Sequence, residues 1–486
     1  MRRNPSKRSI DATPEFQHAG CKTPRIVRGS APTPSIGLTL STSSQRPLQG
    51  DAALVRAIGV FALAAAVINS TIGGGIFRMP GALAAQVGSA APLSLVVGAF
   101  AIIPIALCFA AAGSRTHATG GPYTYVSVAF GPFLGFVAGA LMWISHVASS
   151  AGVAASFAQQ VANLEPAFGT PGARAAFIIG TYALLFVLNA FGVRLGARAV
   201  ATLATIKLAP LVLLVLGGLA FVDWSAVSFS PADVPSIGAL GGSLVLVMFA
   251  YSGMETALVP SGEFSDPAKN VPRATVVAIL LVVALYLGLQ IVGQGVLGPA
   301  LATSPIPLAD TAGKLFYAGR TLLLATACVS MGGFLLGNLL GSSRLLFALG
   351  RDGYLPSIYG RVSASHRVPL MGLATHAGLA CFLAVRGSFD ALAAVSGGAI
   401  CVVYGVVALA AWRLQRMGVA ERGAPFRMPG GALVPLIAAG IMTAILFTLK
   451  GDEWRAIAIS LAVLVAVYAV LHALRRGHAP ASPPGA

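Results

Sequence analysis

Two charged side chains lie deep inside long apolar segments of the sequence. Glu255 stands eight residues before the next acid, Glu263, which places it about 12 Å along a helix. Lys207 stands nine residues after Arg198, about 13 Å along a helix and beyond the easy reach of a snorkelling lysine stem. A charge in hydrocarbon costs about 2.5–3.5 kcal/mol or more, so each side chain needs a compensating role. For Glu255 the alternatives are a functional carboxyl and a structural hydrogen bond to a neighbouring helix. For Lys207 they are a proton carrier and a permanently charged strut.

Two apolar segments are interrupted by residues that helices avoid. The first runs from Ala64 into Asn69-Ser70-Thr71-Ile72-Gly73-Gly74-Gly75, and the second from Val245 into Tyr251-Ser252-Gly253-Met254-Glu255. Consecutive glycines are costly inside a helix, and an unpaired backbone group in lipid costs several kcal/mol. Taken alone, such glycines could equally serve close helix packing. Two corresponding breaks, however, indicate an inverted-repeat transporter whose site lies at the breaks.

The elements that must position these residues are membrane-spanning helices. The composition is 56% hydrophobic and only 10% charged, whereas a soluble domain carries about 25% charged residues. Uncharged stretches such as Ala274–Ile291 approach the ~20 residues that a spanning helix needs. The alternating pattern of a membrane β-barrel is absent from the sequence. We therefore expect an all-α membrane protein with about twelve transmembrane helices, near residues 55–87, 91–113, 123–160, 174–193, 197–221, 238–262, 273–297, 320–350, 368–385, 389–413, 431–449 and 454–474.

The distribution of positive charge favours a membrane protein over a nucleic-acid-binding protein. The net charge is +17, and eight basic residues lie among the first fifty. If the N-terminus is inside, Arg344 and most other basic residues at span ends fall on the cytoplasmic side, while Arg78 and Arg320 are among the few outside. This asymmetry predicts an even number of spans in the bacterial inner membrane, with both termini cytoplasmic. Residues 1–50 are expected to be a disordered basic tail and residues 476–486 a short cytoplasmic tail.

The sequence contains no pattern typical of an enzyme or a metal site. The five cysteines lack paired metal-ligand spacing and indicate neither disulfides nor a metal. We find no nucleophile–base pair and no phosphate-binding loop. The sequence therefore predicts a protein that is not an enzyme and has no cofactor.

Four motifs, in order, resemble the amino acid–polyamine–organocation (APC) family, which has the LeuT fold. They are Ser70–Phe77 with Pro80, Gly120–Tyr123 leading to Phe130–Gly135, Phe249–Glu255 with Pro267–Arg273, and Ser343–Leu346 running into Arg351–Pro356. The resemblance covers residues from about 55 to 475. It implies a 5+5 inverted repeat with broken helices 1 and 6, formed by residues 51–221 and 222–413, followed by two additional helices in residues 414–475. Asn69 departs from the family pattern, because glycine is usual there.

The resemblance also implies a substrate site at the two breaks. The amides of Gly73, Gly74 and Gly75 would hold a carboxylate, because helix N-termini attract anions. Main-chain carbonyls would hold an ammonium, and these belong to Asn69, Ser70, Thr71, Phe249, Ala250, Tyr251 and Ser252. Asn338 is expected either to face the site or to bridge two helices.

Three further residues acquire expected roles from the resemblance. Glu255 resembles a glutamate that gates transport by protonation in a relative that exchanges arginine for agmatine. Lys207 stands where some proton-dependent relatives place an ammonium in the position of a sodium ion, between the first, fifth and eighth helices. The aromatic rings of Tyr123 and Phe249 are candidates for occluding the substrate, although aromatic residues in a membrane core more often serve packing.

The sequence therefore predicts a secondary active transporter for amino acids or related amines, working by alternating access. It would be either coupled to protons or an exchanger. Two alternatives are a membrane-embedded amino-acid sensor without transport and a sodium-coupled symporter of the same fold. Lys207 argues against the symporter, since an ammonium in the cation position would exclude sodium. The sequence leaves open which amino acid or amine is carried and what the oligomeric state is.

Overall fold

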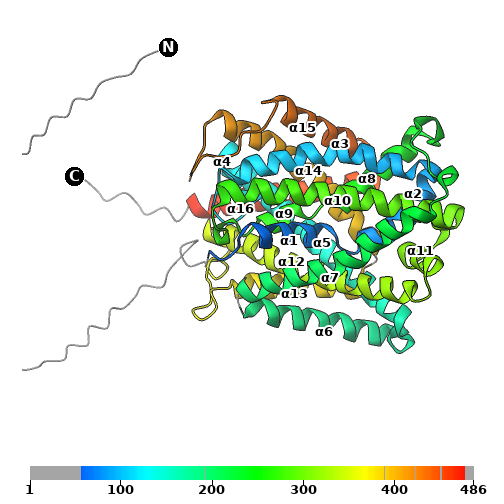
Figure 1. Cartoon of the computed structure of the whole chain (residues 1–486). Helices are drawn as coiled ribbons and strands as arrows, with labels where there is room; N and C mark the ends of the chain where they lie inside the picture. The colour runs from blue at the N-terminus through cyan, green and yellow to red at the C-terminus, as the bar shows by residue number, and fades with distance from the viewer. Residues whose placement is uncertain (1–55, 192, 388, 422, 449–450, 477–486) are drawn as a thin grey trace, which may run out of the picture. The chain divides into compact units, whose positions relative to one another are not determined.

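The computed structural model describes residues 56–191, 193–387, 389–421, 423–448 and 451–476. The expected N-terminal tail and nearly all of the expected C-terminal tail lie outside these residues. The helices of the described part run largely side by side along one direction (Figure 1). They are α1 (Val60–Thr71), α2 (Gly75–Val87), α3 (Ala91–Gly113), α4 (Pro122–Phe130), α5 (Pro132–Leu164), α6 (Pro171–Ala190), α7 (Val193–Gly218), α8 (Ile237–Tyr251), α9 (Met254–Leu258), α10 (Pro267–Leu297), α11 (Pro307–Leu315), α12 (Gly319–Arg351), α13 (Leu370–Arg386), α14 (Phe389–Arg416), α15 (Leu433–Leu446) and α16 (Gly451–Arg476).

The apolar helices overlap the expected spans but do not match them one to one, because the stretch Gly75–Gly113 covers the second half of the first expected span and all of the second. Eight described stretches are long and apolar enough to cross a membrane: Gly75–Gly113, Pro132–Leu164, Pro171–Ala190, Thr202–Phe221, Ile237–Leu258, Pro267–Thr303, Gly319–Arg351 and Val395–Arg416. Four shorter apolar helices accompany them, at Val60–Thr71, Leu370–Arg386, Leu433–Leu446 and Ile457–Leu471. The helical fold is thus confirmed, whereas the twelve crossings and the inverted repeat stay predictions.

Two expectations about the helices were wrong in detail. The span expected at residues 123–160 is two helices, α4 and α5, separated at Gly131, whose φ of 94° is favourable only for glycine. Pro132 then begins α5, where its missing N–H costs nothing. The short helix α11 was not expected, because nine residues that include Asp310 and Lys314 do not resemble a membrane span.

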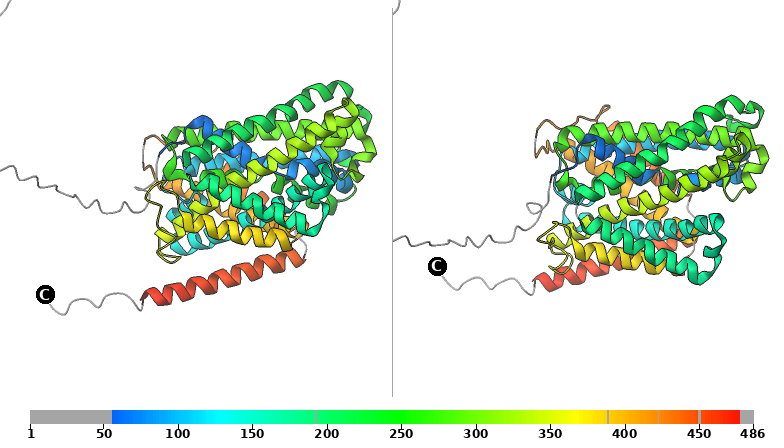
Figure 2. Two further views of the ribbon diagram at one scale, coloured as in Figure 1. Left: turned by 90° about the horizontal axis from the view of Figure 1, so that it is seen from below. Right: turned by 60° about the horizontal axis from the view of Figure 1, so that its bottom comes forward.

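Helix α1 lies at the centre of the packing, and its neighbours come from distant parts of the chain. It contacts α7, α9, α10 and α12, while α5 packs against α12, α13 and α14. In contrast, α16 lies along the edge of the helices in both views of Figure 2 and contacts α5 and α14. The residues at the end of α1 are therefore surrounded by protein rather than by lipid.

A buried ion pair joins α12 to the turn that follows α9. The Arg344 guanidinium Nε lies 3.0 Å from Glu263 Oε1, and the two side chains are 0% and 1% exposed. Arg344 was expected to be one of the basic residues that mark a cytoplasmic span end. It is instead fully enclosed and hydrogen-bonded, also donating to the Ser343 hydroxyl.

Candidate functional site

Both expected helix breaks are present, and they cross in backbone contact. Helix α1 ends at Thr71 and α2 begins at Gly75, while α8 ends at Tyr251 and α9 begins at Met254. Gly253, between α8 and α9, has a φ of 127°, which L side chains rarely adopt. A Cβ atom there would lie 2.3 Å from the main-chain oxygen of Ser70. Only glycine therefore allows the two breaks to approach this closely.

A small cavity lies where the breaks cross. It is lined by Ser70, Thr71, Gly73, Gly74, Gly75, Ser149, Val153, Phe249, Ala250, Ser252 and Phe334, none of which is charged. Its volume is about 20 Å³, which is room for roughly one water molecule. Eight of the expected substrate-binding residues share this lining. The described state of the site is closed around a space too small for an amino acid.

The glycine amides face this cavity from the start of α2. Gly74 is the residue that precedes the helix and Gly75 is its first residue, so their N–H groups have no partner within the helix. The amide of Gly73 differs, because it donates to the main-chain oxygen of Thr71 over 2.9 Å. The anion-attracting end of α2 is therefore formed by Gly74 and Gly75 rather than by all three glycines.

The carbonyls at the end of α1 already have protein donors. Lys207, 0% exposed on α7, donates from Nζ to the main-chain oxygens of Asn69, over 2.9 Å, and Ile72. The Ser330 hydroxyl on α12 also donates to Ile72 O, over 2.9 Å, and the Tyr286 hydroxyl donates to Thr71 O over 3.0 Å. Lys207, on α7, thus contacts the end of α1 and shares the acceptor Ile72 O with Ser330 of α12. A carbonyl oxygen has two lone pairs, so Asn69 O retains one, whereas Thr71 O accepts from both the Tyr286 hydroxyl and the Gly73 amide.

Comparison with known proteins bears directly on this arrangement. Residues 58–472 match the family model described as amino acid permease. The chain belongs to the amino acid permease family. Its resemblance to the APC family is thereby confirmed, and it is a multi-pass membrane transporter and not an enzyme.

Three relatives illustrate the range of this family. The permease is 27% identical to the methylthioribose transporter of Bacillus subtilis (strain 168), over 85% of this chain and 93% of that protein. It is 29% identical to the serine/threonine exchanger SteT of the same organism, over 80% and 90% of the two chains. It is 25% identical to the mouse b(0,+)-type amino acid transporter 1, over 79% and 80%.

Four of the expected site residues have side chains that contact other parts of the permease and not the cavity between the breaks. The Asn69 amide donates to Gly333 O over 2.5 Å, and Asn338 Oδ1 accepts from the Ser342 hydroxyl over 3.4 Å. The Tyr251 ring stacks on Tyr286 with centroids 5.5 Å apart. The Tyr123 hydroxyl donates to Asp352 over 2.6 Å. None of these four residues lines the cavity between the breaks.

Two phenylalanines enclose the cavity, and the sequence pointed to only one of them. A Cβ atom at Gly75 would lie 3.5 Å from Phe249 on α8, and one at Gly73 would lie 2.9 Å from Phe334 on α12. Phe334 was missed because it is one of many aromatic residues in apolar helices, with no neighbouring signal. Ser149 and Val153 on α5 were also missed, because no neighbouring residue in the sequence marks them.

Glu255 lies beside the site and not in its lining. It is 3% exposed, and its Oε2 accepts from the Gly253 amide over 2.9 Å and from the Tyr404 hydroxyl over 2.5 Å. Its Oε1 lies 3.9 Å from His146 Nε2. The sequence identified Glu255 but gave no indication of Tyr404 or His146, which lie 149 and 109 residues away in the chain.

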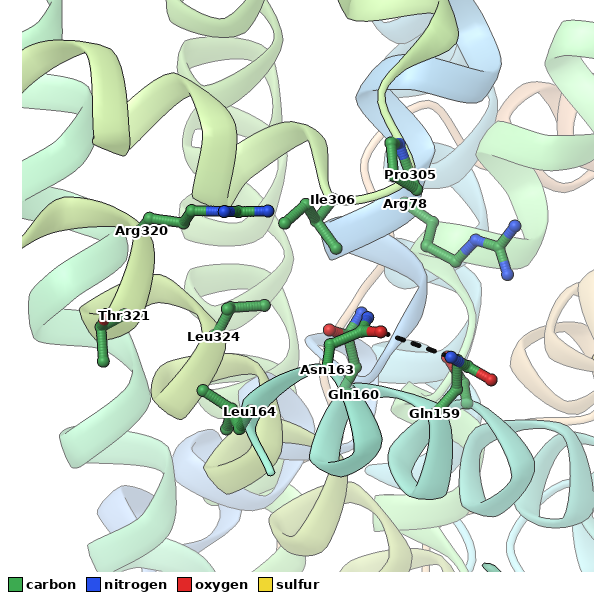
Figure 3. Close-up of a pocket in the computed structure, with 11 residues that line it drawn as sticks. Arg78, Gln159, Gln160, Asn163, Leu164, Pro305, Ile306, Arg320, Thr321 and Leu324 are labelled. Atoms are coloured by element: carbon green, nitrogen blue, oxygen red, sulfur yellow. Dashed lines mark hydrogen bonds between the residues drawn. The ribbon is translucent and has the colours of Figure 1, made fainter. Parts of the chain in front are cut away.

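A larger polar cavity of about 660 Å³ lies between α2, α5 and α12 (Figure 3). Its lining includes Arg78, Arg320, Gln159, Gln160 and Asn163. In Figure 3 the side chains of Asn163 and Gln159 lie on neighbouring turns of α5, and the Gln159 amide donates to Asn163 over 3.4 Å.

A narrow space leads inward from this polar cavity. A pocket of about 10 Å³ shares Gln160, Ile306 and Leu324 with the cavity and also contacts Phe77. Phe77 lies on α2, two residues after Gly75. Because Arg78 of the polar cavity also lies on α2, the cavity and the glycines are at different positions along the same helix, and mostly apolar side chains such as Phe77 lie between them.

Proposed function

We propose that this permease is a secondary active transporter for neutral amino acids that works by alternating access through the crossing of the two helix breaks. The observation that carries the proposal is the cavity at the crossing, which has the start of α2 on one side and no charged lining residue. A free amino acid presents a carboxylate and an ammonium a few Å apart. Broken helices supply N–H donors for the first and carbonyls for the second.

In this proposal the amides of Gly74 and Gly75 bind the carboxylate. The carbonyls of Ser70 and Ala250, one from each break, bind the ammonium. The substrate side chain then lies toward Phe249 and Phe334. An ionised substrate side chain would remain unpaired among these residues, and such a charge is costly in a dry site, so neutral side chains are favoured.

Substrate entry requires a change of conformation, because a volume of about 20 Å³ holds no amino acid. The polar cavity of Figure 3 is the proposed entrance from the outer side of the bacterial inner membrane, with both termini in the cytoplasm. Movement of Phe77 and its apolar neighbours would join that entrance to the site. A second, inward-facing state would then release the substrate.

We propose that transport is either coupled to protons or an obligatory exchange of substrates. Support comes from Lys207, whose ammonium contacts two main-chain carbonyls at the end of α1. Carbonyl oxygens at a helix break are the ligands that such transporters offer to a coupling cation. An ammonium that occupies them leaves no place for sodium. One relative is named a serine/threonine exchanger, which makes exchange the second mode to test.

The test is uptake into proteoliposomes that contain the purified full chain. Labelled serine, threonine, leucine, arginine and methylthioribose are compared, each with a pH gradient, with a sodium gradient and with unlabelled amino acid inside. We expect one or more neutral amino acids to accumulate without sodium and arginine to be excluded. Binding of an amino acid without any uptake would support a sensor instead. Uptake of methylthioribose alone would refute the carboxylate site, since that substrate has no carboxylate.

A further inference from the structure

A chain of buried polar side chains extends from Glu255 away from the substrate cavity. His146, on α5, is 2% exposed and joins three helices. Its Nε2 lies 2.9 Å from the Thr256 hydroxyl and 3.9 Å from Glu255 Oε1, both on α9. Its Nδ1 lies 3.0 Å from the Ser342 hydroxyl on α12. An imidazole held at both nitrogens beside a buried carboxyl is unusual in an apolar chain, where polar groups mark functional paths.

The geometry accommodates the proton on either residue. When Glu255 is protonated, a neutral His146 donates from Nδ1 to Ser342 and accepts the Thr256 hydroxyl at Nε2. When the proton moves, the O–H bond of Glu255 breaks and an Nε2–H bond forms, which leaves a carboxylate beside an imidazolium. Closing the 3.9 Å separation to a hydrogen bond requires an approach of about 1 Å. No other covalent bond changes, although the Thr256 hydroxyl must first turn away from Nε2, whose single lone pair takes the proton. A proton can therefore pass between the two residues without another reactant.

Other ionisable groups lie on the helices around this cluster. Tyr404 on α14 donates to Glu255, and His376 is a second fully buried imidazole on α13, a helix that packs against α5. Neither ring nitrogen of His376 has a hydrogen-bond partner among the described residues. Four others have partners outside the cluster: Tyr123 on α4 bonds Asp352, Tyr182 on α6 bonds Ser150, Arg344 on α12 bonds Glu263, and Tyr468 on α16 packs on Phe133. Tyr125 on α4 and Cys401 on α14 are also buried.

The cluster also spans a contact that must change if α9 moves. A Cβ atom at Gly341 on α12 would lie 2.4 Å from Thr256 O, so α9 is seated directly on α12. His146 holds the same residue of α9 from α5. Any movement of α9 away from these helices separates His146 from Glu255 and interrupts proton transfer between them.

We propose that His146 and Glu255 share one exchangeable proton, which makes His146 a second proton-carrying residue of the permease and links protonation to the position of α9. This inference rests on the proposed transport function, because the proton is the one exchanged during the transport cycle. It adds a residue on α5 to a role that the sequence suggested for Glu255 and Lys207. Thr256 and Ser342 act as positioning residues that hold the imidazole in place.

The first experiment measures uptake of a transported neutral amino acid as a function of pH in proteoliposomes. The parent should vary by about fivefold or more across its transition. His146→Gln keeps an amide that can hydrogen-bond but cannot carry the proton, so its profile should become flat while amino-acid binding is retained. Thr256→Val removes a positioning hydrogen bond and keeps both ionisable groups, so its transition should remain. His117→Gln is the matched control, since His117 is also buried but lies beside Glu421.

A second measurement does not depend on transport. Infrared spectroscopy of the purified protein follows the carbonyl stretch of protonated Glu255, identified by its loss in Glu255→Gln. We expect His146→Gln to shift the pH midpoint of this band by about one unit or more, with no shift in His117→Gln. An unchanged midpoint together with a parent-like uptake profile would overturn the proposal. If no amino acid is transported at all, the proposed function fails, and the infrared midpoint alone decides whether the proton is shared.

Discussion

Lys207 and Asn69 are joined across two helices, with the lysine Nζ donating to the asparagine main-chain oxygen over 2.9 Å. The same ammonium donates to Ile72 O at the end of α1. The residue that the sequence marked as an isolated charge therefore binds the backbone of the first helix break. Its position next to the substrate cavity connects any change in its protonation with the geometry of α1.

Lys207→Ala is expected to abolish gradient-driven uptake, because it leaves Asn69 O without its donor, a loss of about 1–3 kcal/mol for a buried group. Lys207→Arg is expected to fail as well, since arginine keeps the charge but does not release its proton. Uptake and equilibrium binding are both measured, with Lys314→Ala as the control at an exposed lysine. Full gradient-driven uptake by the arginine variant would leave only the role of a charged strut. Sodium-stimulated uptake by the parent would refute the surrogate-cation role.

Gly74→Val is expected to weaken substrate binding by about tenfold or more, equivalent to about 1.4 kcal/mol. A Cβ atom at Gly74 would meet only flexible side-chain atoms, 3.3 Å from Met331 Cε, so the fold should tolerate it. The added carbons would instead fill the space beside the amide. Binding of labelled amino acid is compared with Gly180→Val, where a Cβ atom meets nothing within 4 Å. Normal affinity in Gly74→Val would place the carboxylate elsewhere.

Gly253→Ala is expected to destabilise the protein more than Gly131→Ala does. Both glycines have positive φ, and such sparsely populated backbone conformations cost an alanine about 1–3 kcal/mol. Gly131 has open space around its Cβ position, whereas at Gly253 the new atom would lie 2.3 Å from Ser70 O. Thermal unfolding of the purified variants separates the cost of the positive φ from the cost of the close approach to Ser70 O. Equal melting temperatures would show that the crossing of the breaks is looser than described.

Glu255→Gln is expected to flatten the pH dependence of uptake while substrate binding remains measurable. The glutamine oxygen can still accept from the Gly253 amide and the Tyr404 hydroxyl, so the local structure is retained. The measurement is initial uptake rate against pH. Glu165→Gln serves as the control, since Glu165 is an exposed acid at the end of α5. A profile identical to that of the parent would reduce Glu255 to a structural hydrogen-bonding residue.

The sequence predicted those features that depend on a single residue type in an unfavourable setting. Three consecutive glycines and the isolated Gly253 located both breaks, because helices avoid such residues in lipid. Lys207 could be identified from its depth alone. The apolar runs likewise gave most helices to within several residues, except that they did not predict the division of α4 from α5 at Gly131 or the short helix α11.

The sequence could not predict which helical face each residue occupies. His146, Tyr404 and Phe334 stand in apolar helices without periodic polar neighbours, so their partners depend on packing between distant segments. Asn338 was expected to face the substrate or to bridge two helices, and the structure places it beside Ser342 on its own helix. The hydrogen bond from the Gly73 amide to Thr71 O follows from the local turn at the break. Residue types alone do not specify that turn.

The buried pair of Glu263 and Arg344 has a consequence for how the protein is made. The two residues are 81 positions apart, so Glu263 leaves the ribosome long before its partner. Until α12 is synthesised and docked, the carboxylate lacks the Arg344 guanidinium beside it. We therefore expect the turn after α9 to settle in its final position once α12 has docked. A chain truncated before Arg344 should leave this turn accessible to water-soluble labelling reagents. We therefore expect the ion pair to form late in the assembly of the protein in the membrane.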